Sequence, residues 1–156
     1  YKAKRYDVKG PKQIGSPLKY YYSEVGLRNA RLNFRQQEEN HIMENIIYNE
    51  LRVREFDIDV GIVGVITRLE EGKSKREQYE VDFVANRGSR RYYIQSAFAI
   101  PDEAKREQET RSLIKIQDSF KKIVVLREDI EPWHDDNGIL YIGIEQFLLD
   151  EAAMDL

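Results

Sequence analysis

The chain has 156 residues, of which 41% are hydrophobic and 34% are charged, and this balance suits one compact domain with a modest core. It contains no cysteine, which excludes disulfides, thiolate catalysis and sulfur-ligated zinc and is typical of a reducing, cytoplasmic compartment. No run of eighteen apolar residues occurs, so we expect neither a membrane span nor a secretory signal. The sequence opens at Tyr1 in what resembles the tail of an element, and we expect a piece of a longer protein.

Charge is unevenly distributed along the chain. Residues 1–37 carry nine Lys and Arg against Asp7 and Glu24, a net charge of +7, whereas the remainder carries −10. A basic arm on an acidic body could contact the phosphates of DNA or RNA, fold back on its own body, or meet an acidic partner. If the arm binds nucleic acid, the contacting side chains would be Lys2, Lys4, Arg5, Lys9, Lys12 and Lys19.

The first third of the chain mixes turn signals with one clear helix. Residues 5–8 and 10–14 form two short strands around a Gly-Pro turn, residues 18–22 a short aromatic strand or turn, and residues 26–34 a short helix. From about residue 37 to 54, apolar residues recur at steps of three and four, which predicts an amphipathic helix. These apolar residues are Ile42, Met43, Ile46, Ile47 and Leu51.

The rest of the chain alternates strands and helices, which predicts an α/β fold. We expect strands at 56–67, 78–85, 91–98, 122–126 and 139–143, with the third of these central in the sheet, and a charged turn at 70–75. Asp102, which follows Pro101, is expected to cap a helix that reaches residue 116, and a last short helix is expected at 145–151.

A carboxylate and an amide on neighbouring strands are the first candidates for chemistry. Alternation places Gln95 and Ala97 on one face of their strand, and Asp82 can lie opposite them across the hairpin, where such a cluster could hold Mg²⁺. Asp82 could equally be the solvent face of an amphipathic strand, and Gln95 a buried amide that binds backbone. Glu44 lies near the core edge of the first long helix and needs a partner.

The element order and these residues resemble the PD-(D/E)xK, or restriction-endonuclease-like, superfamily. The resemblance implies a mixed central sheet flanked by helices in the order α-β-β-β-α-β, with Asp82 at the metal-binding aspartate and Glu44 at an auxiliary glutamate. Gln95 then stands where the superfamily has a glutamate, and Ala97 where it has the catalytic lysine. Asp82, Glu44 and Gln95 could still hold a metal, but with Ala97 they would be the remains of an active site.

A second resemblance covers almost the whole chain. The segments that carry it are Pro17-Leu18-Lys19-Tyr20-Tyr21-Tyr22, Val25-Gly26-Leu27-Arg28-Asn29-Ala30, Glu44-Asn45-Ile46-Ile47-Tyr48-Asn49-Glu50-Leu51, Glu80-Val81-Asp82-Phe83 and Tyr92-Tyr93-Ile94-Gln95. Together they resemble the C-terminal domain of unknown function that follows an AAA-type P-loop ATPase in many bacteria and archaea. That family implies an ATP-binding domain ahead of this chain, with residues 1–36 as the end of a winged-helix segment and connector and residues 37–156 as the nuclease-like domain.

We therefore expect a non-catalytic accessory domain that binds nucleic acid or regulates and oligomerises the ATPase, with no cofactor of its own and no membrane partner. One alternative is an active Mg²⁺-dependent nuclease whose lysine has migrated, and the other is a pure protein-interaction domain. Candidates for a migrated cation are Arg87, Arg90, Arg91, Lys105 and Arg111, although a guanidinium is a poor base.

Two further motifs carry less information. The run Trp133-His134-Asp135-Asp136 contains metal-ligand residue types, but before Gly138 it is more typical of a turn with a packed tryptophan. His41, at the start of a helix, is expected to be a surface or capping residue, and Glu50 is expected to be a plain surface carboxylate or a member of a salt bridge.

Overall fold

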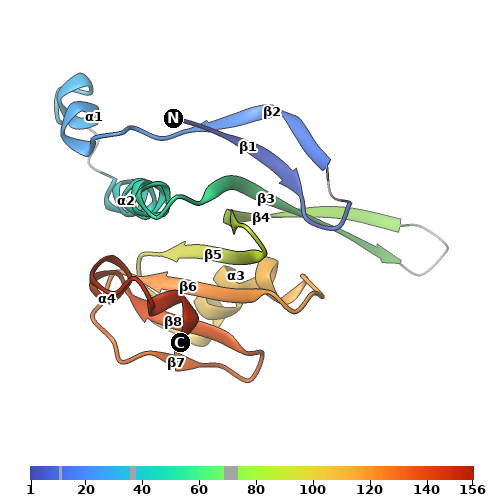
Figure 1. Ribbon diagram of the computed structural model, residues 1–156. Coiled ribbons are helices and arrows are strands. Elements are labelled where there is room, and N and C mark those ends of the chain that lie inside the picture. The colour runs from blue at the N-terminus through green and yellow to red at the C-terminus, as the bar shows by residue number, and fades with distance from the viewer. Residues whose placement is uncertain (11, 36–37, 69–73) are drawn as a thin grey trace.

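The computed structural model describes residues 1–10, 12–35, 38–68 and 74–156, and Figure 1 shows how the elements are arranged. In chain order these are β1 (Lys2–Asp7), β2 (Lys12–Tyr20), α1 (Val25–Arg31), α2 (Glu39–Val53), β3 (Asp57–Arg68), β4 (Ser74–Arg87), β5 (Arg90–Ala97), α3 (Glu103–Ile114), β6 (Lys121–Leu126), β7 (Trp133–His134), β8 (Ile139–Gly143), α4 (Ile144–Leu149) and the 3₁₀ helix η2 (Ala153–Asp155). The fold is mixed α/β, as expected.

All the strands belong to one eight-stranded sheet in the order β2-β1-β3-β4-β5-β6-β8-β7. The pairs β1–β3, β5–β6 and β6–β8 are parallel, and the others are antiparallel. β5 is in the interior of the sheet, as predicted. The basic N-terminal strands extend this same sheet, because β1 pairs with β3 and β2 forms its outer edge (Figure 1).

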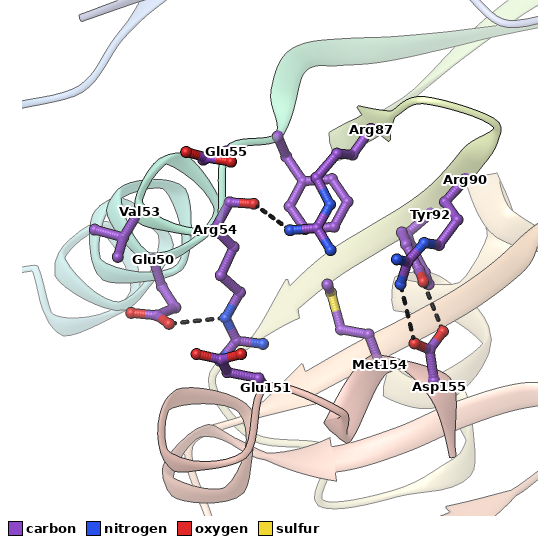
Figure 2. Close-up of a pocket in the computed structure, with 11 residues that line it drawn as sticks. Glu50, Val53, Arg54, Glu55, Arg87, Arg90, Tyr92, Glu151, Met154 and Asp155 are labelled. Atoms are coloured by element: carbon purple, nitrogen blue, oxygen red, sulfur yellow. Dashed lines mark hydrogen bonds and ion pairs between the residues drawn. The ribbon is translucent and has the colours of Figure 1, made fainter.

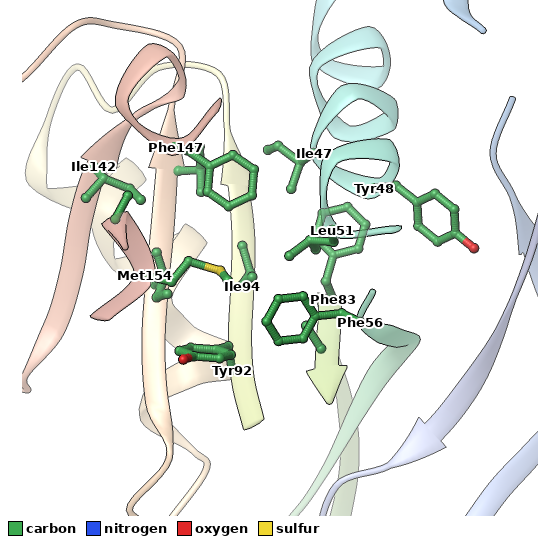
Figure 3. Close-up of a cluster of buried hydrophobic side chains, with 14 of the residues drawn as sticks. Ile47, Tyr48, Leu51, Phe56, Phe83, Tyr92, Ile94, Ile142, Phe147 and Met154 are labelled. Carbon is green, nitrogen blue, oxygen red and sulfur yellow. The ribbon is translucent and has the colours of Figure 1, made fainter. Parts of the chain in front are cut away.

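Helices cover both faces of the sheet and define two hydrophobic clusters. On one face α2, α4 and η2 pack through Leu51, Phe147 and Met154 against Phe83 and Ile94 of the strands, as Figure 3 shows. On the other face Leu113 of α3 belongs to a second cluster with valines and tyrosines of β3, β4, β5, β6 and β8. Strands buried on both faces explain the continuous apolar runs at 123–126 and 139–142.

Most of the predicted elements are confirmed, with shifted ends. α2 begins at Glu39, and residue 37, where the predicted helix begins, is outside the described residues. Asp102 caps α3 as predicted, because its carboxylate accepts a hydrogen bond of 2.8 Å from the Lys105 N–H. The prediction for residues 10–22 was wrong in detail, since one strand, β2, runs from Lys12 to Tyr20. Pro11 and most of the charged turn at 70–75 lie outside the described residues, and β7 was not predicted.

A β-bulge in β4 changes which way its acidic residue faces. Asp59 pairs with Val84, but Gly61 pairs with Val81, so the two residues between Val81 and Val84 oppose a single residue of β3. Phe83 consequently packs on the α2 side, and Asp82 interacts on that side too. No helix among the described residues is long and apolar enough to cross a membrane.

Candidate functional site

An ammonium group lies where three carboxylates converge. Lys19 Nζ is 2.8 Å from Glu44 Oε1, 2.9 Å from Glu80 Oε1 and 3.5 Å from Asp82 Oδ1. Glu44 comes from α2, Glu80 and Asp82 from β4, and Lys19 from β2, so three elements distant in sequence meet at one point. The side chains of Asp82 and Glu44 are only 13% and 14% exposed, and those of Lys19 and Glu80 are 29% and 34% exposed, so these ion pairs are partly buried. We call these four residues the carboxylate cluster.

The end of β2 is fixed on α2, and this positions Lys19. The Asn45 side chain accepts a hydrogen bond of 2.8 Å from the Tyr22 N–H and donates one of 2.8 Å to the Tyr22 carbonyl. The Tyr21 ring stacks on Tyr48 with 4.0 Å between ring centroids, and its hydroxyl donates to Glu44 Oε1 at 2.6 Å. Lys19 and Tyr21 are two residues apart in extended backbone, so they reach Glu44 from the same side.

Asp82 lies where β4 and β5 separate. The pairing between the two strands ends at Phe83 and Ile94, beyond which the Ser96 N–H has no β4 carbonyl opposite it. Asp82 Oδ2 takes that place, accepting hydrogen bonds from Ser96 N at 2.9 Å and from Gln95 Nε2 at 2.8 Å. The bulge and the separation together turn a strand carboxylate into a buried acceptor.

The outer side of the cluster is closed by a second cation. Arg5 of β1 forms an ion pair of 3.0 Å between its Nη2 and Glu80 Oε2. Two cations therefore face three carboxylates, which leaves one excess negative charge in a region of low solvent exposure. Part of the basic arm has folded back on the acidic body, one of the alternatives that the charge distribution left open.

The pKa values follow from burial and from this charge count. Burial, with Glu44 nearby, raises the pKa of Asp82 to about 7, although the Lys19 ammonium and the Ser96 N–H act to lower it. Burial acts to lower the pKa of Lys19, but the Asp82 and Glu44 carboxylates outweigh it and raise that pKa, so Lys19 stays protonated. Burial and Glu44 likewise raise the pKa of Tyr21, which keeps its hydroxyl a donor.

A polar hollow of about 290 Å³ opens beside the cluster. Lys19, Tyr21 and Glu44 form the part of its lining that belongs to the cluster, and Arg28 and His41 add two basic side chains. Solvent and small ligands can therefore approach the ammonium from this side.

The restriction-endonuclease resemblance implies a divalent metal at this place, and the residues do not fit one as arranged. In the part of the chain that the structure describes, no three His, Asp or Glu side chains are placed to hold a metal ion. The carboxylate oxygens that would coordinate it are directed at Lys19 instead. Gln95 directs its amide nitrogen to Asp82, and its buried Oε1 has no hydrogen-bond partner among the described residues. The amide oxygen alone is a weak basis for a metal site.

The structure brings Glu44, Asp82 and Gln95 together as the sequence predicted, but not Ala97. Ala97 is 1% exposed and packs in the cluster under α3. Lys19 supplies an ammonium to the pocket, although sequence analysis had assigned it to the nucleic-acid-binding arm and had not named it among the candidates for a migrated cation. A local signal was present in the alternation of Lys19 with Tyr21, which places both on one side of a strand.

Among the ion pairs of the described residues, those of the carboxylate cluster include none of the cations proposed to replace the missing lysine. Arg91 hydrogen-bonds Asn86, Arg87 donates to the Arg54 carbonyl, and Lys105 pairs with Glu109. Of the remaining two, Arg90 pairs with Asp155, and the Arg111 guanidinium lies over the Tyr79 ring.

The basic residues of the arm and the turn at residues 133–136 are the other features that the sequence singled out. Of the six basic residues expected to contact nucleic acid, Lys2, Lys4 and Lys9 are exposed, Arg5 and Lys19 are ion-paired, and the Lys12 side chain lies outside the described residues. Asp135 shapes a turn by accepting from the N–H groups of Asn137 and Ile139, with Trp133 stacked on Tyr141, as the turn interpretation predicted. His41 is exposed and pairs with Glu38, and Glu50 pairs with Arg54.

Comparison with known proteins gives one informative likeness. A protein of Haemophilus influenzae, described only as uncharacterized, is 32% identical over 149 residues, which are 96% of this chain and 33% of that protein. The chain thus spans about a third of the length of the curated relative that it matches. No family model matches the chain, and no solved structure matches it.

Proposed function

We propose that this chain is a nuclease-like accessory domain without nuclease activity, attached to a P-loop ATPase. One observation carries the proposal: the Lys19 ammonium lies between Glu44, Glu80 and Asp82, where a catalytic metal would have to lie. A protonated lysine bound by three carboxylates is not available as a base, and the carboxylates are not available to a metal. The helix-strand-strand-strand-helix-strand order of α2 to β6 supports a restriction-endonuclease-like origin.

The cluster would act as a clamp rather than as an active site. Its ion pairs join β2 of the arm to α2 and β4 of the body, so a displacement of the arm must break buried charge pairs. The matched relative is about three times as long as the segment it shares with this chain, which leaves room for an ATPase domain. The clamp would then couple the position of the arm to the body.

The arm would also bind nucleic acid through its phosphate backbone. Lys2 and Lys4 alternate along β1 and are exposed together with Lys9, so three ammonium groups can meet phosphates without disturbing the cluster. Such binding is independent of sequence and weakens with salt because bound counterions are released. Each lost phosphate contact should reduce the salt dependence, the slope of log K against log salt, by about 0.9.

A second candidate function is Mg²⁺-dependent cleavage of nucleic acid with Lys19 as the migrated lysine. Two observations favour it: the Lys19 ammonium reaches the carboxylates although Ala97 has no such group, and the polar hollow beside the cluster carries the basic side chains Arg28 and His41. It requires the carboxylates to exchange an ammonium for a divalent ion.

One experiment separates these functions. The purified protein is mixed with fluorescent DNA and RNA, with EDTA, Mg²⁺ or Mn²⁺, and both cleavage and binding anisotropy are followed. We expect no cleavage, and binding with a salt slope that falls by about 2.7 when Lys2, Lys4 and Lys9 are changed to Gln. The matched control changes three exposed lysines of the body, Lys75, Lys115 and Lys121, to Gln. Cleavage that disappears in Asp82→Asn overturns the proposal in favour of the nuclease, and absence of both cleavage and binding leaves protein interaction.

A further inference from the structure

A second pocket lies at the other end of α2 from the carboxylate cluster, bounded by the β4–β5 turn and the C-terminal residues. Arg54, Arg87 and Arg90 surround it, with Met154 on its floor (Figure 2). Glu44 precedes Arg54 by ten residues, which is about 15 Å along a helix, so the two sites are separate. We propose that this arginine pocket binds a phosphate group, and this inference does not depend on the proposed function.

The buried guanidinium of Arg54 is the main reason to expect a phosphate in this pocket. Its side chain is 7% exposed, Nε donates to Glu50 Oε1 at 2.8 Å, and Nη2 donates to the Phe147 carbonyl. The Phe147 ring lies 5.0 Å from the guanidinium carbon. The remaining nitrogen, Nη1, is buried and has no hydrogen-bond partner among the described residues. A fixed guanidinium with one unsatisfied buried donor requires an acceptor at that position.

The other two arginines reach the pocket from the β4–β5 turn. Arg87 donates to the Arg54 carbonyl at 2.8 Å and lies 4.9 Å from the Phe56 ring, and no carboxylate in the described part of the chain pairs with it. Arg90 lies 3.5 Å from Asp155 Oδ2, and Asp155 is held by a 2.6 Å hydrogen bond from the Tyr92 hydroxyl. Both arginines are exposed residues and can turn toward a ligand without unfolding the chain.

The carboxylates around the pocket do not change its preference for an anion over a cation. Glu50 is already paired with Arg54, and Asp155 with Arg90 and the Tyr92 hydroxyl. The other two carboxylates of the lining, Glu55 and Glu151, are exposed. The unsatisfied buried group is a donor, which a cation cannot satisfy. The planar N–H pairs of arginine match phosphate oxygens in both charge and spacing.

The size of the pocket limits the ligand. Its volume is about 230 Å³, below the roughly 300–1,000 Å³ of pockets that enclose drug-sized molecules. A single phosphate group fits, whether as free phosphate or as the terminal phosphate of a nucleic acid strand, and a whole nucleotide does not.

The test is calorimetric titration of the 156-residue protein with inorganic phosphate, with chloride of equal ionic strength as the blank. We expect a Kd of about 1 mM or below, weakened about tenfold in Arg87→Gln and in Arg90→Gln because each removes a charge-assisted contact. Arg127→Gln, an exposed arginine outside the pocket, is the control and should leave the Kd unchanged. Arg54→Lys should abolish binding; because it can also weaken folding, its thermal unfolding is measured in parallel and the two surface variants carry the test.

A comparison of oligonucleotides with 5′-phosphate and 5′-hydroxyl ends identifies the source of the phosphate. Tighter binding of the phosphorylated strand, with competition by inorganic phosphate, identifies a strand end; inorganic phosphate binding without that difference identifies the free anion. Both outcomes support the pocket. Absence of phosphate binding, or equal weakening by Arg127→Gln and Arg87→Gln, overturns it.

Discussion

Replacement of Lys19 by Met tests the clamp, because methionine keeps an unbranched side chain, one atom shorter, and removes the ammonium with its charge and its hydrogen-bond donors. The variant leaves Glu44, Glu80 and Asp82 facing one another without the ammonium that lies 2.8, 2.9 and 3.5 Å from them. Removing one partner of a buried ion pair costs about 3–5 kcal/mol. Since Lys19 is 29% exposed, we expect the lower end, about 3 kcal/mol of unfolding free energy.

Urea unfolding at pH 8 measures this loss. With a slope of about 2 kcal/mol per molar urea, the midpoint of Lys19→Met should fall by about 1.5 M. Lys75→Met is the matched control: Lys75 also makes a 2.8 Å ion pair, with Glu77, but its side chain is 61% exposed, so its loss should cost at most about 1 kcal/mol. The deficit of Lys19→Met should shrink toward pH 5, because protons can then replace the ammonium. If Lys19→Met and Lys75→Met lose equal stability, the cluster is not a clamp.

Three further predictions test the same description. Burial raises the pKa of Asp82 from 3.8 to about 7, so the folded state holds a proton that the unfolded state releases. The unfolding free energy of the wild type should therefore fall by up to about 4 kcal/mol from pH 4 to pH 7. A pH series of urea unfolding should show a shallower fall for Asp82→Asn. Millimolar Mn²⁺ should leave the melting temperature of the wild type unchanged and raise that of Lys19→Met, in which the carboxylates lack the ammonium and keep only Arg5 at Glu80. Differential scanning calorimetry would contradict the ammonium's role if Mn²⁺ stabilised both proteins equally. Gly61→Ala should lower the unfolding free energy by about 1–3 kcal/mol, because a Cβ there would lie 2.9 Å from Val84 Cγ2. Gly64→Ala on the same strand is the control: its Cβ meets nothing within 4 Å, so thermal unfolding should be unchanged.

Local sequence signals predicted the elements well because the relevant interactions are local. The spacing of Ile47 and Leu51 within α2 reflects a helix face buried against the sheet, and Asp102 hydrogen-bonds a backbone N–H three residues away. Such contacts depend on the residues of one segment, so periodicity and capping rules detect them. β7 was missed because a two-residue strand has no period to detect.

The candidate site was predicted only in half because its other half comes from a distant part of the chain. Asp82 and Gln95 lie on adjacent strands of one hairpin, and their hydrogen bond follows from that neighbourhood. Lys19 reaches Asp82 only through the β2–β1–β3–β4 order, in which β1 pairs in parallel with β3. A parallel pair such as Arg5 with Val60, 55 residues apart, leaves no mark on the local sequence, so the position of the arm relative to the acidic body stayed open.

The bulge explains a second difference between sequence and structure. Strict alternation places Asp82 and Phe83 on opposite faces of β4, which allowed Asp82 to be a solvent-facing residue. The extra residue opposite β3 turns both toward α2, so that Phe83 lies 6.3 Å from the Tyr48 ring while Asp82 meets Lys19. Alternation counts residues and cannot register an unpaired one.

The attachment of Lys19 to the sheet explains why an ammonium, rather than a metal ion, would hold this position. A metal ion must arrive from solution and lose its water, whereas Lys19 is held beside the carboxylates by β2, by the Asn45 hydrogen bonds to Tyr22 and by the stacking of Tyr21 on its neighbour in α2. Tethering of this kind raises the effective concentration of the ammonium to the millimolar range or above. A competing Mg²⁺ would also have to leave a buried ammonium without partners, at a cost of several kcal/mol. The balance therefore favours Lys19 as long as β2 remains on the sheet, and displacement of that strand is the event that would open the carboxylates to another cation.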